Sequence, residues 1–429
     1  MLYALIAHFG LATKQMDCTL AYLNAFLDRK VYARCPEGYN KPGMILLIKK
    51  ALYGLKESAN LWQKLLIKVL YDLGLNSIPG THCFFTDGRI FLVFYVDDIY
   101  AAFHPMHSGH YAEFEAKLMA RFKVKSLGEG THFLGIRIVR NIEDKKLWLL
   151  QDAYIDKLQA KFNIPLDKPP KNPLPYNIPL LPNQSKATKE EIYLYQQLVG
   201  SINFAAIMTR PDIARLLSKL SEFLLNPSKD HIKAAKHAIR YMVGTKYLAL
   251  QFDGQIGYHE LHHKYEPFQA FSDAAFADNP GTMHSSWGMV FKLFGGVIDY
   301  KASKQRTVAT ATAHAELMAL SATAKTFIYW LRFFDYIHLN LETTPTIKCD
   351  NQATIRLLEN ESLNLSTKLK HIRIHEAWLR QEVQRKNIRI EYTPTNDMAA
   401  DGMTKELNGQ KLKTFIQLLG MVDIRSQFE

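Results

Sequence analysis

The sequence contains no uninterrupted apolar run close to the ~20 residues that a membrane-spanning helix requires. The N-terminus, from Met1 to His8, lacks the basic segment and the cleavage site of a signal peptide, and it fits one face of an amphipathic helix. Cysteine is scarce, with 4 among 429 residues and none in CxxC spacing. This scarcity argues against a disulfide framework or a zinc site and favours a reducing compartment.

Acidic residues are outnumbered, 41 against 53 lysines and arginines, which gives a formal net charge of +12. A surplus of this size favours a polyanionic partner, either nucleic acid or an anionic membrane surface. Apolar residues make up 48% of the chain. At this length and composition we expect two to three globular domains, each with its own core.

The most informative stretch runs from Phe91 to Phe103, where two apolar runs flank Asp97 and Asp98. The pattern predicts two buried strands joined by a tight turn. Asp-Asp is a poor turn sequence, but it places two carboxylates at the tip of a rigid hairpin. Neighbouring carboxylates repel each other unless a cation lies between them, so the pair favours a divalent-metal site with oxygen ligands. The alternative is a solvent-exposed loop that carries two acids.

Around this hairpin, strands and helices alternate through residues 1–163, which predicts an α/β or split βαβ sheet with the carboxylates at one edge. Residues 164–189 are rich in proline and predict a linker. Residues 190–253 then predict helices. The helix expected at 229–243 is basic, which suits either a solvated face or a contact with a phosphate backbone. Polar residues 254–267 predict a second linker.

A second group of acids lies in the C-terminal third, on four elements of a predicted β-β-β-α-β-α-β-α pattern. Asp273 lies in an apolar strand, where an acid needs a partner. Asp350 ends a strand and is suited to cap the next helix, while Glu316 and Asp401 fit exposed positions on helices. Together the four suit a two-metal phosphodiester site, in which carboxylates hold two cations ~3.5–4 Å apart.

The motifs resemble those of one known family. Tyr95-Val-Asp97-Asp98 is similar to the signature of a reverse transcriptase palm, and three earlier segments resemble its copia-type LTR retrotransposon branch: Gln15–Asp17, Ala21–Asn24 and Leu52–Lys56. The segments around the four C-terminal acids resemble the ribonuclease H domain of the same family: Ser272–Ala274, Ala315–Glu316, Cys349–Ala353 and Ala400–Lys405. The resemblance extends from Gln15 to about Leu407.

The resemblance implies an α/β (α+β) fold in which a reverse transcriptase palm with a split βαβ sheet and a helical thumb and connection precede a ribonuclease H-like α/β domain. We therefore expect a palm at 1–163 with its fingers mostly missing, a proline-rich linker at 164–189 and a helical thumb and connection at 190–253. The ribonuclease H-like domain is expected at 268–408 and a C-terminal tail at 409–429.

The resemblance also implies the site residues. The polymerase metal ligands are expected at Asp17, Asp97 and Asp98, and the nuclease metal ligands at Asp273, Glu316, Asp350 and Asp401. Substrate contacts are expected at Tyr22, Gly54, Lys56, Gly135 and His371, with Tyr22 placed to exclude a ribose 2′-hydroxyl. Two Mg²⁺ ions per active site, or Mn²⁺ in their place, are the expected cofactors.

The implied partners are an RNA template, a DNA primer, an RNA–DNA hybrid, deoxynucleoside triphosphates and the rest of a Pol polyprotein, with no membrane partner. The family's replication places such a chain in the cytoplasm or nucleus.

The sequence departs from the family pattern at a few places. The chain opens almost directly on the Asp17 motif, so we expect an N-terminally truncated polymerase without the fingers segment that grips the triphosphate. Glu57 stands where the family is neutral, His314 where it usually has an acid, and Ala377 where it has a histidine. Three hypotheses therefore stay open: a polymerase fused to ribonuclease H, a ribonuclease H alone, or a nucleic-acid-binding remnant without catalysis.

Overall fold

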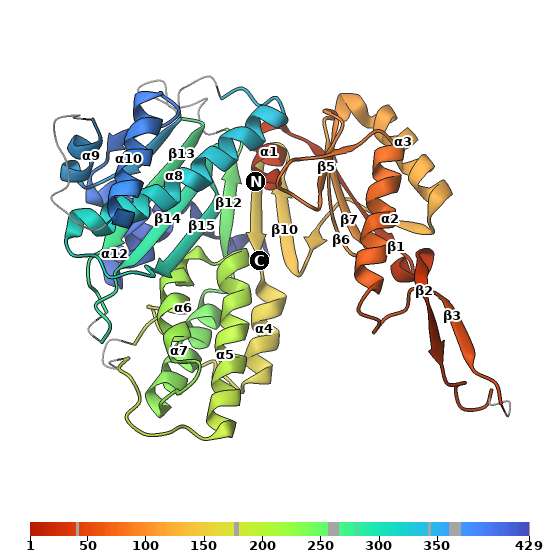
Figure 1. The fold of residues 1–429 in the computed structure, drawn as a ribbon, viewed down its shortest axis with the longest axis horizontal. Helices are drawn as coiled ribbons and strands as arrows, with labels where there is room; N and C mark the ends of the chain where they lie inside the picture. The colour runs from red at the N-terminus through yellow and green to blue at the C-terminus, as the bar shows by residue number, and fades with distance from the viewer. Residues whose placement is uncertain are drawn as a thin grey trace.

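The computed structural model describes residues 1–39, 43–175, 180–255, 266–279, 281–341, 345–359 and 370–428, with side chains from 373 onward in the last range. Sheets and helices alternate along the chain, and the expected mixed α/β fold is confirmed. Three larger sheets lie side by side across the molecule, with a group of helices below them and a two-stranded hairpin projecting at one end (Figure 1). None of the helices in these ranges has both the length and the apolarity needed to cross a bilayer.

The first sheet has six strands in the order β4-β5-β6-β7-β1-β8. Helices α2 (Ser58–Asp72) and α3 (Ser108–Arg121) cover one face, where Trp62, Leu66 and Phe114 pack against strand residues such as Ile99. This is the split sheet expected for the N-terminal part. Its strands are β1 (Ala12–Cys18), β4 (Asn76–Ser77), β5 (Phe84–Thr86), β6 (Ile90–Tyr95), β7 (Asp98–Phe103) and β8 (Val124–Gly128).

A separate two-stranded hairpin follows β1 and projects from the first sheet (Figure 1). It consists of β2 (Phe26–Ala33) and β3 (Leu46–Lys50). A short 3-10 helix, Ala21–Asn24, leads directly into β2. Val31 pairs with Ile48, so pairing across the hairpin stabilises this segment as a strand.

The middle sheet joins distant parts of the chain in the order β18-β12-β11-β10-β9. The segment expected to be a tail, 409–429, instead contains α12 (Gly409–Leu418) and β18 (Met421–Asp423), and Met421 pairs with Leu250. The sheet therefore includes strands from three of the expected domains, whose boundaries stay a prediction. Its other strands are β9 (His132–Phe133), β10 (Ile136–Asn141), β11 (Lys146–Leu150) and β12 (Leu248–Asp253).

Four α-helices below the middle sheet form a separate core: α4 (Asp152–Lys161), α5 (Lys189–Met208), α6 (Ala214–Leu220) and α7 (Lys229–Gly244). Capping boxes begin α5 at Thr188 and α7 at Ser228. Two basic residues of α7 bind the irregular segment between α4 and α5. Arg240 donates to the carbonyl oxygen of Asp167 at 2.8 Å, and a ring nitrogen of His237 lies 3.0 Å from the carbonyl oxygen of Asn172. These two side chains therefore hold residues 167–172 and do not extend toward a phosphate backbone.

The third sheet has the order β15-β14-β13-β16-β17, antiparallel from β15 to β13 and parallel from β13 to β17. The predicted β-β-β-α-β-α-β-α pattern is present, with α10 as an additional helix before the last strand. The elements are β13 (Phe268–Ala275), β14 (Ser286–Leu293), β15 (Gly296–Lys304), α8 (Thr312–Tyr336), β16 (Thr346–Cys349), α9 (Gln352–Glu359), α10 (Lys370–Gln384), β17 (Arg389–Tyr392) and α11 (Asp401–Thr404).

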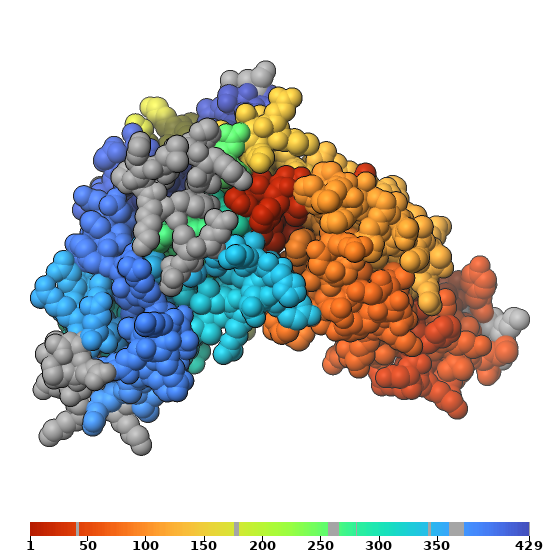
Figure 2. Space-filling view, turned by 90° about the horizontal axis from the view of Figure 1, so that it is seen from above, coloured from red at the N-terminus to blue at the C-terminus, as the bar shows by residue number. Residues whose placement is uncertain are grey.

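The largest hydrophobic core is continuous across the three sheets. Helix α1 (Leu2–Phe9) contributes Leu5 and Ile6, and the Phe84 and Phe333 rings meet at 5.5 Å between the first sheet and α8. Seen from above, the first sheet with its hairpin and the third sheet with its helices form two arms with a hollow between them (Figure 2). The core at the junction fixes the positions of the two arms relative to each other.

Candidate catalytic sites

The turn between β6 and β7 differs by one residue from our expectation. Tyr95 pairs with Asp98, so Val96 and Asp97 are the two turn residues and Asp98 begins β7. Val96 has a φ of 57°, which is rare for a β-branched residue. Trp62, only 1% exposed on α2, donates a 2.6 Å hydrogen bond to the Val96 carbonyl oxygen. Helix α2 thus holds the turn that carries Asp97.

Strand β1 brings the third predicted carboxylate to this turn. Asp17 lies opposite Asp98 in the antiparallel pairing of β1 and β7, and the backbone N–H of Cys18 donates to the Asp97 carbonyl oxygen at 2.8 Å. Burial, followed by the charges of Asp97 and Asp17, raises the pKa of Asp98, while a hydrogen bond from Gln15 lowers it. The three acids expected as polymerase ligands therefore lie together at one edge of the first sheet, partly open to solvent.

Two aromatic rings lie beside these acids. Tyr22, on the short helix after β1, contacts Tyr53 with ring centroids 4.5 Å apart. The pKa of Tyr53 is raised by burial, by Asp97 and, to a smaller extent, by Tyr22 and Asp17. Tyr53 was not among our candidates. Its place inside the Leu52–Lys56 motif was the only sequence signal for it.

Four other residues were predicted to contact the substrate, three at the first site and His371 in the ribonuclease H-like part. Gly54 (φ 95°) and Lys56 are exposed, and in the described ranges neither bonds to the three acids. Gly135 (φ 75°) lies in the turn between β9 and β10, where a Cβ would come 3.8 Å from the Phe204 ring of α5. The His371 side chain lies outside the described residues. These four residues keep their roles only as predictions.

The second site lies where β13, β16, α8 and α11 meet. Ser272 pairs with Cys349 in the parallel register, which places the next residues side by side, Asp273 within β13 and Asp350 directly after β16. Asp273 is 1% exposed and Glu316, on α8, is 5% exposed. The structure therefore places three of the predicted acids in or beside the buried edge of the third sheet.

The fourth acid, Asp401, begins α11, and a glycine lets this helix approach the sheet. A Cβ on Gly288 of β14 would lie 2.3 Å from the Cβ of Met403. Thr404 of the same helix donates a hydrogen bond to Asp273. The close packing of α11 on β14 thus sets the position of Asp401 relative to the strand carboxylates.

Burial and mutual repulsion dominate the electrostatics of the second site. The pKa of Glu316 is raised to about 9, first by burial and then by Asp273 and Asp350. Burial also raises the pKa of Asp273 to about 6, although Lys405 and the Thr404 hydroxyl counteract it. Buried carboxylates that repel one another are suited to bind a divalent cation, because its charge offsets the repulsion.

The ligand atoms of Glu316, Cys349 and Asp350 all lie within 4.8 Å of one another, and no other such group of three occurs in the described residues. Burial raises the pKa of the Cys349 thiol to about 12, so this sulfur stays protonated at neutral pH. The carboxylate oxygens therefore fit a hard cation such as Mg²⁺ or Mn²⁺ better than a thiol-seeking metal. The three acids of the first site do not reach this spacing.

Lys405 is the residue of the second site that our candidate list lacked. Its ammonium group donates to Asp401, and Asp273, Asp401 and Asp350 raise its pKa against the effect of burial. Thr395 also donates to Asp350, at 3.1 Å. Lys405 belongs to the Ala400–Lys405 motif, but a cation is no metal ligand, so residue type gave no reason to choose it.

Comparison with known proteins places this chain among similar sequences. Residues 1–175 match the model of the family described as reverse transcriptase (RNA-dependent DNA polymerase). The chain is 31% identical over 432 residues to the retrovirus-related Pol polyprotein from transposon TNT 1-94 of Nicotiana tabacum, covering 97% of this chain and 31% of that protein. It is 29% identical over 420 residues to the corresponding polyprotein from transposon RE1 of Arabidopsis thaliana, covering 96% and 27%.

The chain thus spans about a third of the length of these relatives. Among solved structures it is similar to a foamy viral protease-reverse transcriptase in complex with RNA/DNA hybrid, with 15% identity, 90% of this chain and 44% of that chain covered, and a TM-score of 0.48. The similarity to the reverse transcriptase family thus covers residues 1–175. Over 96–97% of its length the chain is similar to the retrovirus-related Pol polyproteins of plant transposons.

Proposed function

We propose that this chain is an RNA-directed DNA polymerase with ribonuclease H activity, and that each reaction uses two divalent cations. The observation that carries the proposal is the arrangement of the acids: Asp17, Asp97 and Asp98 meet on paired strands, and a separate group surrounds Glu316. Bound Mg²⁺ or Mn²⁺ would supply charge neutralisation and an activated oxygen at both sites. The partners of this function are an RNA template, a DNA primer, deoxynucleoside triphosphates and an RNA–DNA hybrid.

In the first site, Asp17, Asp97 and Asp98 hold the cations, and the Trp62 hydrogen bond positions Asp97. Tyr22 contacts the Tyr53 ring, and we propose that it lies under the sugar of an incoming nucleotide and excludes a 2′-hydroxyl. Phosphoryl transfer depends mainly on such positioning and on charge neutralisation.

In the second site, Asp273, Glu316, Asp350 and Asp401 are the cation ligands for cleavage of the RNA strand of a hybrid. Lys405 holds the Asp401 carboxylate next to the other acids. We assign no direct role in the reaction to Cys349.

The test is primer extension on an RNA template with Mg²⁺ and deoxynucleotides, measured beside cleavage of a labelled RNA–DNA hybrid. Asp97→Asn should abolish extension and leave hybrid cleavage intact, and Asp350→Asn should do the reverse. Exposed acids on the same supporting helices serve as matched controls, Asp72→Asn on α2 and Asp335→Asn on α8. Hybrid cleavage that persists in Asp350→Asn would contradict the assignment of the second site.

One observation favours a second candidate, a ribonuclease H without polymerase activity. In the second site, carboxylate oxygens of Glu316 and Asp350 lie within 4.8 Å of each other beside the Cys349 thiol, and the first site has no comparable group of three in the described residues. Under this candidate, hybrid cleavage depends on Asp350 while the unmodified chain shows no extension. If neither reaction occurs and hybrid binding remains, the chain is a nucleic-acid-binding remnant.

A further inference from the structure

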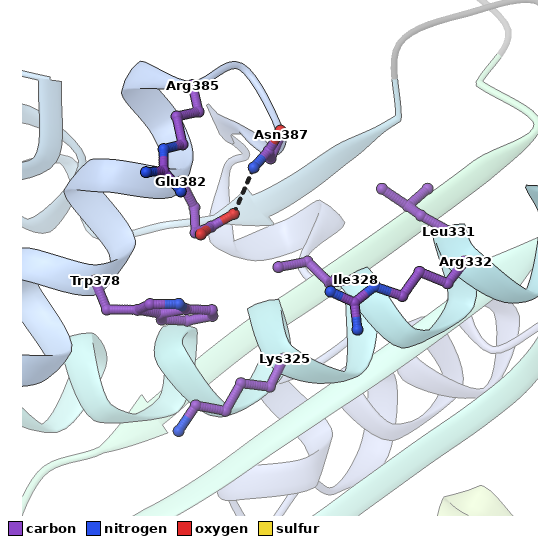
Figure 3. A pocket seen from close by; sticks show the side chains of 8 residues that line it. All are labelled: Lys325, Ile328, Leu331, Arg332, Trp378, Glu382, Arg385 and Asn387. Atoms are coloured by element: carbon purple, nitrogen blue, oxygen red, sulfur yellow. Dashed lines mark hydrogen bonds between the residues drawn. The ribbon is translucent and has the colours of Figure 1, made fainter. Parts of the chain in front are cut away.

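A groove of about 600 Å³ lies between α8 and α10, separate from both groups of acids (Figure 3). Lys325, the residue of the groove nearest to Glu316 along α8, follows it by nine residues, which corresponds to about 13 Å along a helix. Arg332 lies another two turns away. The groove is therefore distinct from the second site, although both include residues of α8.

Three cations line this groove. Lys325 and Arg332 are seven residues apart on α8, so they share one face of the helix about 10 Å apart along its axis. Arg385 follows the end of α10 on the opposite side. All three side chains are exposed, and none forms an ion pair with an acid in the described ranges, whereas the neighbouring Arg380 pairs with Glu376 at 2.8 Å. Their charge is therefore available to an anionic ligand.

An aromatic ring, the buried Glu382 and the exposed Asn387 complete the lining. The Lys325 ammonium group lies 5.6 Å from the centroid of the Trp378 ring. In Figure 3 this ring is seen nearly edge-on, with Lys325 on one side and Glu382 and Asn387 on the other. Glu382 is only 9% exposed and accepts a 2.8 Å hydrogen bond from the Asn387 amide. The groove thus offers a ring for stacking next to a fixed carboxylate and amide.

We propose that this groove binds a nucleotide unit of a single-stranded nucleic acid. The net charge of the lining is +2, from three cations and Glu382, and this charge suits the phosphates. Trp378 is suited to stack on a base, and Glu382 with Asn387 to bond its polar edge. A duplex keeps its bases stacked on one another, so a groove built around one ring selects a single strand. Binding in this groove does not depend on activity at either catalytic site.

The test measures fluorescence anisotropy of a labelled 12-nucleotide single strand with the full chain in EDTA, so that metal-dependent catalysis plays no part. The variant Lys325→Gln/Arg332→Gln should bind about tenfold more weakly. The slope of its log affinity against log salt should also be shallower by about 1.4, since each lost phosphate contact on a single strand removes about 0.7 from this slope. Trp378→Ala should weaken binding at least about fivefold, and Trp378→Phe, which keeps a ring, should retain most of it.

The matched control removes two exposed cations from α4, Lys157→Gln/Lys161→Gln, and leaves the groove intact. An equal loss in this control would reduce the effect to general charge and overturn the proposal. Unchanged binding in Lys325→Gln/Arg332→Gln would overturn it as well. Deoxyadenosine monophosphate at millimolar concentration should not displace the strand, and displacement would reassign the groove to free nucleotides. Cleavage of a blunt RNA–DNA hybrid by Lys325→Gln/Arg332→Gln reports separately on the proposed nuclease and should be unchanged.

Discussion

The indole N–H of Trp62 donates a 2.6 Å hydrogen bond to the carbonyl oxygen of Val96, a residue that the β6–β7 turn holds at a φ of 57°. The pair joins helix α2 to the turn that carries Asp97. A β-branched residue in this conformation stores strain, and the surrounding contacts must compensate for it.

We expect Trp62→Phe to lower the free energy of unfolding by about 1–3 kcal/mol, because the Val96 carbonyl loses its buried donor. Primer extension should fall more than hybrid cleavage, since only the first site depends on this turn. Urea denaturation and the two activity assays measure the effects. Trp148→Phe is the control, because it removes a comparable bond to Gln251 in the middle sheet. Equal losses of extension in both variants would contradict a specific role for the turn.

Gly288→Ala should disturb the second site from a distance. The added Cβ would lie 2.3 Å from Met403 and would push away α11, which carries Asp401. We expect a loss of about 1–3 kcal/mol in stability and a loss of hybrid cleavage, with primer extension preserved. Gly200→Ala on α5 is the control, since its Cβ meets nothing within 4 Å. Full cleavage activity in Gly288→Ala would show that the position of α11 is unimportant.

Lys292 provides a prediction about pH. Burial lowers its pKa from 10.5 to about 8, and its ammonium group donates to the Leu418 carbonyl oxygen at 3.1 Å. The unfolded chain therefore binds this proton more tightly than the folded chain does. As a result, the free energy of unfolding should rise as pH rises from about 8 to 10.5. Lys292→Met should remove this rise and stabilise the chain at pH 7 by about 1 kcal/mol. Urea denaturation across this pH range, with exposed Lys301→Met as control, measures the difference.

Divalent metal should stabilise the chain through the second site, where buried like charges oppose one another. At tenfold its Kd, Mg²⁺ should raise the free energy of unfolding by about 1.4 kcal/mol, and EDTA should reverse the effect. Asp350→Asn should lose most of the gain, and Asp335→Asn should keep it. Thermal unfolding with and without metal provides the measurement. A full gain in Asp350→Asn would place the responsible ion elsewhere.

The local pattern of the sequence was sufficient for much of the fold. The apolar runs around Asp97 predicted two strands, and the C-terminal third was predicted to follow a β-β-β-α-β-α-β-α order that includes α8, because burial of one face determines such elements. The exact turn was missed by one residue. Pairing of Asp98 with both Tyr95 and Asp17 places it inside a strand, and pairing across the chain has no local signature.

The remaining differences have the same physical origin. Strand β18 has only three residues and pairs with Leu250 and its neighbours, which are far away in sequence, so no periodicity reveals it. Lys405 and Tyr53 became candidates only through their neighbours in space. The grouping of the four distant acids had little local signature. Asp350 alone fits a helix cap and Glu316 and Asp401 fit surface positions, and only Asp273, in an apolar strand, indicated a need for a partner.

The strand order of the middle sheet also determines when this sheet can be completed during synthesis. Strands β9 to β11 leave the ribosome before β12, which follows some hundred residues later, and the edge strand β18 comes later still. Domains usually fold as units while the chain grows. Here the centre of the molecule waits for Met421, so the unpaired edge of β12 needs protection until β18 has been made.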